Sequence, residues 1–452
     1  MTSGLLSSGG VVGAETAGKN PVRMIESGPA AGALAACHYA ELLGIDRLMS
    51  FDMGGTTAKA CLIENRTPLV TGLFEVDRRY RFKEGSGLPV TVPSIDLIEI
   101  GAGGGSIAHV DDLGLLKVGP ESAGSNPGPA CYGRGGQSAT VTDADLVLGL
   151  IDAENFLGGD MSLDKPACEA AMARLGQALN VSPVQAARGI YRIVTEAMAS
   201  AARTHATDRG VDYRGLPLFA FGGAGPLHAC GVADLLQSTC VIVPPQSSVL
   251  SAFGTLVTPV RLDLVRSDLT LVAHLDWTRV DRVLGDLESE GMAALGQSGC
   301  ATKDVTILVG ADMRYVGQQH EVTVIFETDP RQSRDAGALA QQFEAAYRTL
   351  YGVNPSHVPI EIVTWRVVAR GPSPHFDGQA RPVIAQGQAK RHRPVHAWQD
   401  DQSVPVYERA ALAVGQSIAG PAIIEERETT TALPPGWNAT IDSLGCIIAR
   451  KG

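Results

Sequence analysis

The sequence predicts an α/β domain over residues 1–265 and a β-rich α+β domain over residues 266–452. In the first region, apolar strands alternate with Ala-rich helices, which is the pattern of an α/β domain. The chain has 52 glycines in 452 residues, well above the usual ~7%, and their clusters fall in the first 260 residues. After about residue 266, short alternating stretches separated by Pro and Gly replace this pattern.

The expected elements of the first domain alternate in type along the chain. Pro29, placed in a first turn before an Ala-rich run, predicts a helix start, and Gly44 predicts its end. Ile190, Val194 and Met198 recur at helical spacing in a longer segment. We expect a helix over 25–43, strands over 46–52 and 58–64, a helix over 184–208 closed by Gly210, a strand over 216–221 and a helix over 227–236.

The second domain is expected to contain mostly strands. They are predicted over 305–309, 321–327, 360–369, 404–407, 422–426 and 447–450, with one amphipathic helix over 338–350. Residues 386–396 (QGQAKRHRPVH) are polar and basic, and we expect a solvated connector there.

Composition excludes several classes of protein. Lys and Arg number 37 against 48 Asp and Glu, giving a formal net charge of −11, which argues against a nucleic-acid partner. Hydrophobic residues at 44% exclude a disordered chain. No stretch approaches the roughly 18 apolar residues of a membrane span, and residues 1–20 lack a signal-peptide pattern. The 8 cysteines form no CxxC pair and indicate free thiols, so we expect a cytoplasmic protein without a membrane partner.

Two familiar phosphate-binding patterns are nearly matched, and both are rejected. Residues 13–20 (GAETAGKN) imitate the P-loop, but Asn20 stands where the Mg²⁺-binding hydroxyl belongs. Residues 101–106 and 223–228 have another residue where the dinucleotide-binding pattern requires its third glycine. A Rossmann dinucleotide site is therefore not expected.

A better candidate lies between two predicted strands, where residues 51–59 are FDMGGTTAK. Glycines at a strand–turn–strand junction let the backbone fold tightly and present amide N–H groups to phosphate oxygens. Thr56 and Thr57 add hydroxyl donors. Asp52, at the end of the strand, could hold Mg²⁺ through water or orient an attacking water. The alternative is an ordinary Asp/Gly hairpin turn.

A second glycine-rich segment, residues 222–226 (GGAGP), follows the predicted strand over 216–221. Small residues at such a strand–helix junction allow a flat adenosine ring to lie against the backbone, and a helix N-terminus favours phosphate. Close strand–helix packing would explain the same residues. Together, the two segments in this order resemble the actin/Hsp70/sugar-kinase ATPase superfamily.

Polar residues flank a further glycine loop at residues 101–105. Asp96, Glu99 and His109 lie on either side of it, and Asp143 belongs to a Thr-Asp-Ala triplet. Their positions suggest metal or substrate contacts near a glycine-lined cleft, although no zinc-site spacing is present. Loop-capping carboxylates and a surface histidine are the alternative.

The motifs taken together carry a closer resemblance. In order they are SGPAA, FDMGGT, IGAGGGSI, VGPESAGSNPGPACYG, TDA, FGGAGPLHA, DMRYVGQ and GPAIIEE, at residues 27–31, 51–56, 100–107, 118–133, 142–144, 221–229, 312–318 and 420–426. This series resembles the hydantoinase A/5-oxoprolinase family, which also includes acetone- and acetophenone-carboxylase subunits. The resemblance covers most of the chain and is weakest around residues 266–300 and 373–400.

The resemblance implies an actin/Hsp70/sugar-kinase-like (RNase H-like) ATPase domain ahead of the β-rich domain. It implies that ATP and Mg²⁺ are used to open a cyclic amide by phosphorylating its carbonyl oxygen, together with a hydantoinase B-like partner subunit. The implied sites are catalytic Asp52, a phosphate loop of Gly54, Gly55, Thr56 and Thr57 with Lys59, and an adenosine loop of Gly222, Gly223, Ala224 and Gly225. The candidate metal ligands are Asp52, Glu99 and Asp143.

Two departures from the family pattern bear on function. Full-length members begin with another Asp-x-Gly-Gly-Thr segment on an amino-terminal domain, and nothing before Asp52 matches it. We therefore expect a truncated or split chain, with a separate amino-terminal ATPase half as a further partner. Lys59 stands where many relatives place Asp, and either contacts phosphate or replaces an acidic metal-site residue. The alternatives for the whole chain are an acetone- or acetophenone-carboxylase-like subunit and a non-catalytic truncated assembly subunit.

Overall fold

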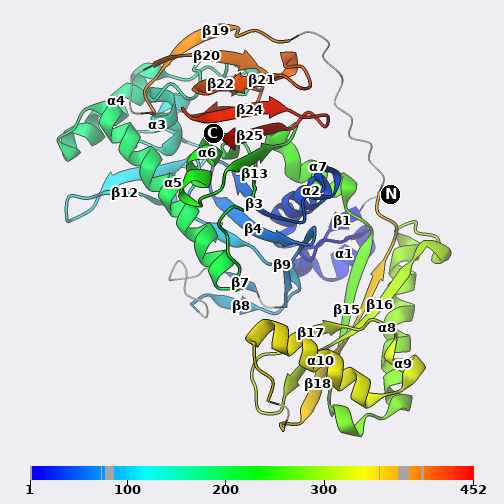
Figure 1. The fold of residues 1–452 in the computed structure, drawn as a ribbon. Coiled ribbons are helices and arrows are strands. Elements are labelled where there is room, and N and C mark those ends of the chain that lie inside the picture. Colours follow the sequence, from blue (N-terminus) through cyan, green and yellow to red (C-terminus); the bar gives the residue numbers. More distant parts are fainter. Residues whose placement is uncertain (1–2, 73, 77–85, 356, 375–385, 399–401) are drawn as a thin grey trace. The chain divides into compact units, whose positions relative to one another are not determined.

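The computed structural model describes residues 3–72, 74–76, 86–355, 357–374, 386–398 and 402–452. Its contacts form two compact units, each assembled from several segments of the chain (Figure 1). One unit contains residues 1–30, 91–94 and 255–375, and the other contains residues 31–90, 95–254 and 376–452. The expected boundary near residue 265 divides the sequence, whereas the compact units are interleaved along it.

The larger unit is built on a nine-stranded mixed sheet. The strand order is β10-β4-β3-β13-β14-β25-β24-β21, with β5 beside β4. The strands are β3 (Arg47–Met53), β4 (Ala58–Glu64), β5 (Thr67–Pro68), β10 (Ile98–Ile100), β13 (Leu218–Phe221), β14 (Cys240–Val243), β21 (Ser417–Ala419), β24 (Trp437–Ile441) and β25 (Ile447–Lys451). Strand β13 runs parallel to both β3 and β14, so the carboxyl ends of these three strands lie at one edge.

Helices cover both faces of this sheet (Figure 1). One face packs against α5 (Pro183–Thr207) and α6 (Gly225–Leu235), and the other against α2 (Ser27–Leu43) and α7 (Leu250–Val257). Helices α3 (Val141–Val147) and α4 (Lys165–Leu179) pack on α5. Alternate residues of β3 pack into the hydrophobic cores on the two faces of the sheet, because successive side chains of a strand point to opposite faces. Phe51 joins the first core and Leu48 the second. The predicted α/β architecture is confirmed.

A second sheet in this unit overturns one expectation. Strands β19 (Arg391–Val395), β20 (Gln402–Glu408), β22 (Ala422–Glu425) and β23 (Thr430–Leu433) pair in that order. The solvated connector predicted over 386–396 is therefore wrong where β19 lies. Arg391 and Arg393 both bond to Glu425, whose side chain is only 2% exposed. Because the opposite charges are paired, a basic segment can form a strand against a buried neighbour.

Several short hairpin strands complete the larger unit and its connections. They are β6 (Val70–Thr71), β7 (Phe74–Val76), β8 (Leu88–Val90), β9 (Ser94–Ile95), β11 (Ser106–Val110) and β12 (Leu116–Ser122). Strand β7 pairs with β8, and β11 pairs with β12.

The smaller unit is an antiparallel sheet of order β15-β18-β16-β17 packed against helices. Its elements are β1 (Ser3–Leu5), β2 (Val11–Gly13), α1 (Ala14–Lys19), β15 (Arg261–Leu271), α8 (Trp277–Gln297), β16 (Thr306–Tyr315), β17 (Val322–Ile325), α9 (Pro330–Ser333), α10 (Ala336–Tyr351) and β18 (Ile360–Arg370). Helix α8 was not expected, although Asp276 caps its first turn and Val280, Leu284 and Leu287 are buried at helical spacing. Helix α1 occupies the residues that imitate a P-loop.

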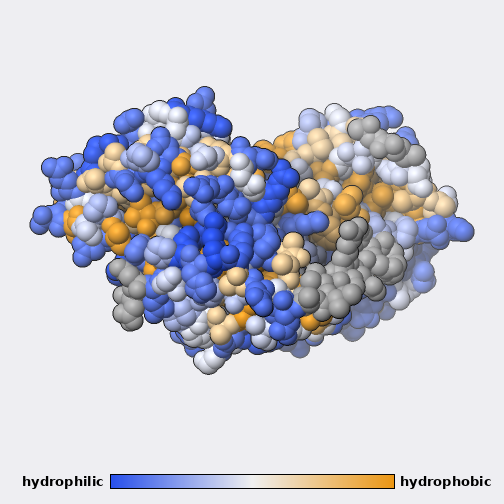
Figure 2. Space-filling model, turned by 90° about the horizontal axis from the view of Figure 1, so that it is seen from above, coloured by the Kyte–Doolittle hydropathy of each residue, from blue (hydrophilic) through white to orange (hydrophobic). Residues whose placement is uncertain are grey.

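Two expectations from composition can be checked directly. All eight cysteines are free thiols. Within the described ranges, each helix is too short or too polar to cross a bilayer. On the face shown in Figure 2, hydrophobic side chains form separate patches between wide hydrophilic areas.

Candidate functional site

The turn between β3 and β4 leaves a row of backbone donors free. The N–H of Gly54 donates to the carbonyl of Thr57 over 3.0 Å and closes the turn. The N–H groups of Gly55, Thr56 and Thr57 donate to no residue in the described part of the chain. Gly55 and Thr56 are exposed. Successive free amides at a tight turn form a concavity suited to an anion.

The glycine loop at residues 101–105 packs directly on this turn. The N–H of Gly104 donates to the carbonyl of Gly54 over 3.1 Å, and that of Gly105 to Gly55 over 2.6 Å. A Cβ atom on Gly103 would lie 2.5 Å from the carbonyl carbon of Thr56, so only glycine fits there. The backbone of the glycine loop therefore fixes the position of the turn through two hydrogen bonds.

The Thr-Asp-Ala triplet fixes that glycine loop in turn. Thr142 donates to the carbonyl of Gly104 twice, from its N–H over 2.7 Å and from its hydroxyl over 2.8 Å. Both residues are buried, so these bonds are shielded from competing water.

The second glycine-rich segment meets the same turn from β13. The N–H of Ala224 donates to the carbonyl of Met53 over 3.0 Å. Gly222 has a φ of +87°, and a Cβ atom there would lie 2.4 Å from the Met53 carbonyl oxygen. Gly223 is exposed beside it. The structure thus brings the predicted phosphate and adenosine loops together at the carboxyl ends of two parallel strands, where α/β sheets commonly bind ligands.

Three charged residues follow one another across this edge of the sheet. Lys59 on β4 is the register partner of both Asp52 on β3 and Glu99 on β10. The Lys59 Nζ lies 2.9 Å from Glu99 Oε1 and 2.9 Å from Thr57 Oγ1. Burial raises the pKa of Asp52 to about 6, against an opposing effect from the positive charge of Lys59.

Asp143 lies apart from this row and has a structural role. Its carboxylate accepts from the N–H groups of Ala130, Cys131 and Thr140 and from the Thr140 hydroxyl, and it is fully buried. It forms a capping box with Thr140 at the start of α3, so the loop-capping alternative is confirmed for this residue. Across the described ranges, no three His, Cys, Asp or Glu side chains gather as a metal site would require. Asp52, Glu99 and Asp143 are therefore not brought together as one ligand set.

Two other polar candidates near the glycine loop also have ordinary surroundings. Asp96 forms an ion pair with Arg209 at the end of α5. His109 is exposed on β11, as the surface-histidine alternative expects.

Comparison with known proteins gives matches over most of the chain. The sequence model for hydantoinase/oxoprolinase matches residues 3–264, and the model for the hydantoinase/oxoprolinase C-terminal domain matches residues 274–449. The chain belongs to the hydantoinase/oxoprolinase family. The chain is 36% identical to an uncharacterized protein of Methanocaldococcus jannaschii, over 98% of this chain and 64% of that protein. It is 35% identical to caprolactamase subunit alpha of Pseudomonas jessenii, over 96% of this chain and 63% of that subunit.

A solved relative confirms the predicted fold class. The crystal structure of ATP-dependent caprolactamase from Pseudomonas jessenii superposes with a TM-score of 0.80 at 32% identity. The superposition covers 100% of this chain and 65% of the caprolactamase chain. The chain thus spans somewhat less than two thirds of the length of the relatives it matches.

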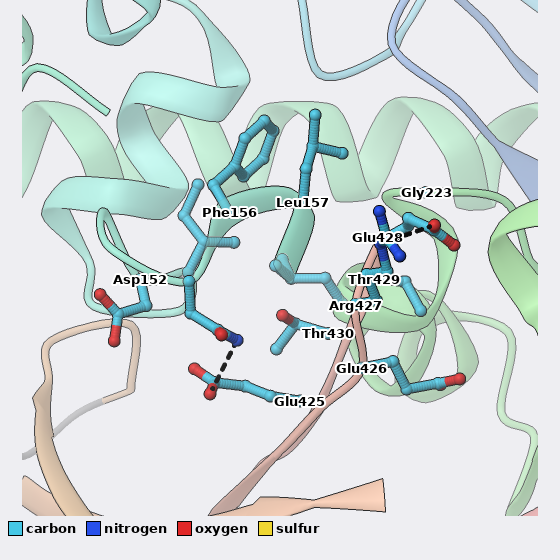
Figure 3. Close-up of a pocket in the computed structure, with 13 residues that line it drawn as sticks. Asp152, Phe156, Leu157, Gly223, Glu425, Glu426, Arg427, Glu428, Thr429 and Thr430 are labelled. Atoms are coloured by element: carbon cyan, nitrogen blue, oxygen red, sulfur yellow. Dashed lines mark hydrogen bonds and ion pairs between the residues drawn. The ribbon is translucent and has the colours of Figure 1, made fainter. Parts of the chain in front are cut away.

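A pocket opens beside Gly223, between α6 and the turn that joins β22 to β23 (Figure 3). Phe156 and Leu157 lie on one side of it, and Glu425 and Glu426 on the other. The full lining is Ile151, Asp152, Asn155, Phe156, Leu157, Gly223, Leu227, Glu425, Glu426, Arg427, Glu428, Thr429 and Thr430. Sequence reasoning missed this pocket, because its walls come from three distant segments and no local spacing links them.

Proposed function

We propose that this chain is part of an ATP-dependent enzyme that opens a cyclic amide, with the nucleotide phosphates bound at the β3–β4 turn. The observation that carries the proposal is the row of N–H groups at Gly55, Thr56 and Thr57, which bond to no residue in the described part of the chain and lie against the glycine loop that packs on the turn. A solved relative is named as an ATP-dependent caprolactamase, and a lactam is a cyclic amide. Both facts support phosphoryl transfer to an amide.

The nucleoside is proposed to lie on Gly222, Gly223, Ala224 and Gly225 and to enter the adjacent pocket. The acidic side chains of the pocket lining are held in ion pairs, Asp152 and Glu425 with Arg391 and Arg393, and Glu426 with Arg409. We therefore place the phosphates at the β3–β4 turn and not in the pocket. Its apolar wall of Phe156 and Leu157 suits a flat base. The phosphates then extend from Gly223 toward the turn, where free amides favour negative charge.

The chemistry follows from these positions. The amide carbonyl oxygen attacks the terminal phosphorus of ATP and ADP leaves, which makes the amide carbon electrophilic. Water then adds to that carbon, and the ring C–N bond breaks as the nitrogen takes up a proton. The acyl phosphate that remains reacts with a second water, which gives the open-chain carboxylate and phosphate. Asp52 is proposed to orient the attacking water and to accept its proton when ionised. The chain's main contribution is positioning and charge stabilisation around the phosphates.

Mg²⁺ is expected with ATP, but the carboxylates of this chain do not fit a metal site. Asp143 is used by the α3 cap, and Lys59 stands between Asp52 and Glu99. No step is therefore assigned to protein-bound Mg²⁺. A partner subunit is also proposed, because the caprolactamase relative is named as one subunit.

Calorimetric titration with ATP tests the phosphate site, and Thr56→Val and Thr57→Val are the informative variants. Each removes a hydroxyl donor to a charged ligand, so ATP binding is expected to weaken by about tenfold. Thr67→Val, on exposed β5, should bind ATP like the wild type. Equal binding by all three variants would contradict the proposal.

The reaction itself requires the complete complex with its partner. ATP hydrolysis should then depend on an added cyclic amide, and the Asp52→Asn variant should lose it. Turnover that requires bicarbonate would instead indicate a carboxylase.

A further inference from the structure

In the register of the sheet, Lys59 lies between two acidic residues at the proposed phosphate site, and among the described residues its ammonium pairs with Glu99 and not with Asp52. Asp52, Lys59 and Glu99 are consecutive register partners on β3, β4 and β10. Side chains of directly paired residues share one face of a sheet, so the three charges form a row of negative, positive and negative sign. The row lies beside the turn whose amides are free.

The ammonium group of Lys59 makes two polar contacts, one with a hydroxyl and one with a carboxylate. Its Nζ donates to Thr57 Oγ1 and pairs with Glu99 Oε1, both at 2.9 Å. An ammonium group has three N–H donors, so one remains after these two contacts. The Lys59 side chain is only 18% exposed, whereas Glu99 is 49% exposed.

A divalent cation would need the space that this ammonium fills. Mg²⁺ is bound through carboxylate and water oxygens, and it prefers ligands of negative charge. The Lys59 charge, in contact with Glu99 and close to Asp52, would repel it. The third predicted ligand, Asp143, is occupied in the α3 cap and supplies no compensating charge.

We propose that Lys59 takes the place of a protein-bound divalent cation between Asp52 and Glu99, so that a metal ion reaches the site only as a complex with the nucleotide. The inference rests on the proposed nucleotide function. Glu99 holds Lys59 through a half-exposed ion pair, and such pairs are weak. A phosphoryl oxygen at the turn can therefore replace Glu99 as the partner of Lys59, while the Thr57 hydroxyl donates its own proton to the same group.

Titration with Mn²⁺ alone, followed by the electron paramagnetic resonance signal of the free ion, tests this proposal without activity. The wild type should bind no Mn²⁺ when nucleotide is absent. Lys59→Met removes the charge, keeps a side chain of similar length and leaves two carboxylates facing the gap. It should gain about one equivalent of bound Mn²⁺, with affinity raised by at least about tenfold.

Three control variants show whether the gain in Mn²⁺ binding depends on the row of Asp52, Lys59 and Glu99. Lys117→Met removes an ammonium from a surface pair with Asp111 and should gain no Mn²⁺. Lys59→Arg keeps the charge and should bind no more than the wild type. The double variant Lys59→Met/Glu99→Gln should lose most of the gain.

Two outcomes would overturn the proposal. In the first, the wild type binds Mn²⁺ without nucleotide and the Glu99→Gln variant does not. This result can be observed without any variant of Lys59. The other is a folded Lys59→Met, judged by its circular dichroism and melting, that gains no Mn²⁺. A chain that binds no ATP would contradict the proposed function instead, and the titration with metal alone keeps these two failures distinct.

Discussion

A Cβ atom added to Gly222 would lie 2.5 Å from Oδ1 of Asp52, so the glycine that follows β13 and the carboxylate near the end of β3 share one space. Phe221 and Asp52 are register partners on these parallel strands. Gly222, which follows Phe221, therefore lies directly against the Asp52 carboxylate. Any side chain at position 222 would displace that carboxylate.

Gly222→Ala should destabilise the fold and move Asp52. Its φ of +87° is unfavourable for alanine, and the new methyl group would clash with the Met53 carbonyl. We expect a loss of about 1–3 kcal/mol in the free energy of unfolding. Gly223→Ala is the matched control, because the nearest atom to its Cβ would be 3.7 Å away. Denaturant unfolding of both variants checks the difference, and equal midpoints would contradict it.

The Asp52 carboxyl should make stability depend on pH. Its pKa is raised from 3.8 to about 6 by burial, so the folded state binds the proton more tightly than the unfolded state. The resulting stabilisation is fully present below pH 3.8 and is lost as pH rises through about 6. It amounts to about 3 kcal/mol at most.

Asp52→Asn removes this dependence. The variant should be more stable than the wild type at pH 7, and its stability should change less between pH 4 and 6. Unfolding in denaturant across that range measures the slope. A wild type with no decline over this interval, relative to Asp52→Asn, would show that the carboxyl titrates normally. Activity should fall below pH about 6, because the base is then protonated.

Asp143→Asn should act on stability and leave metal dependence unchanged. The carboxylate accepts four hydrogen bonds at a buried helix start, and an amide cannot accept all of them. We expect a loss of about 2–4 kcal/mol. Melting curves with Mg²⁺ and with a chelator should shift equally. A loss seen only when Mg²⁺ is present would support a ligand role for Asp143 instead.

Thr142→Val should loosen the glycine loop without unfolding the chain. It removes the hydroxyl that donates to Gly104, while the backbone bond to the same carbonyl remains. The cost should be about 1 kcal/mol. Hydrogen exchange at the amides of Gly104 and Gly105 should accelerate, since both donate to the turn. Thr349→Val, at an exposed position of α10, should leave their exchange unchanged.

The parts of the fold that could be predicted are those with a strong local pattern. Strand β4 matches its expected range over 58–64, and α5 differs by one residue at each end, because apolar periodicity and a Ser182 cap define it. Strand β19 was missed because its stabilising partner, Glu425, is 32 residues from Arg393 in sequence. Helix α8 carried a detectable pattern after Asp276, and the expectation of short alternating stretches there was wrong.

The site could be predicted as a set of segments but not as an arrangement. The glycine segments near residues 54, 103 and 222 were grouped as one motif series, but the contacts between them depend on the order of the strands in the sheet. The sequence could not separate the capping and metal roles of Asp143, since both use a carboxylate in a short polar triplet. The pocket beside Gly223 depends on residues 425–430 folding back to α6, which no local signal indicates.

Strand β25 has a consequence for biosynthesis. Residues 447–451 pair with β14 on one side and β24 on the other. They belong to the same sheet as β3 and β4, which the Asp52 turn joins. While those residues are still inside the ribosomal exit tunnel, β14 presents an unpaired edge to the cell. Such exposed edges attract other chains. The emerging chain therefore has a long interval in which a chaperone is most useful, and the interval closes only when residue 451 has left the ribosome.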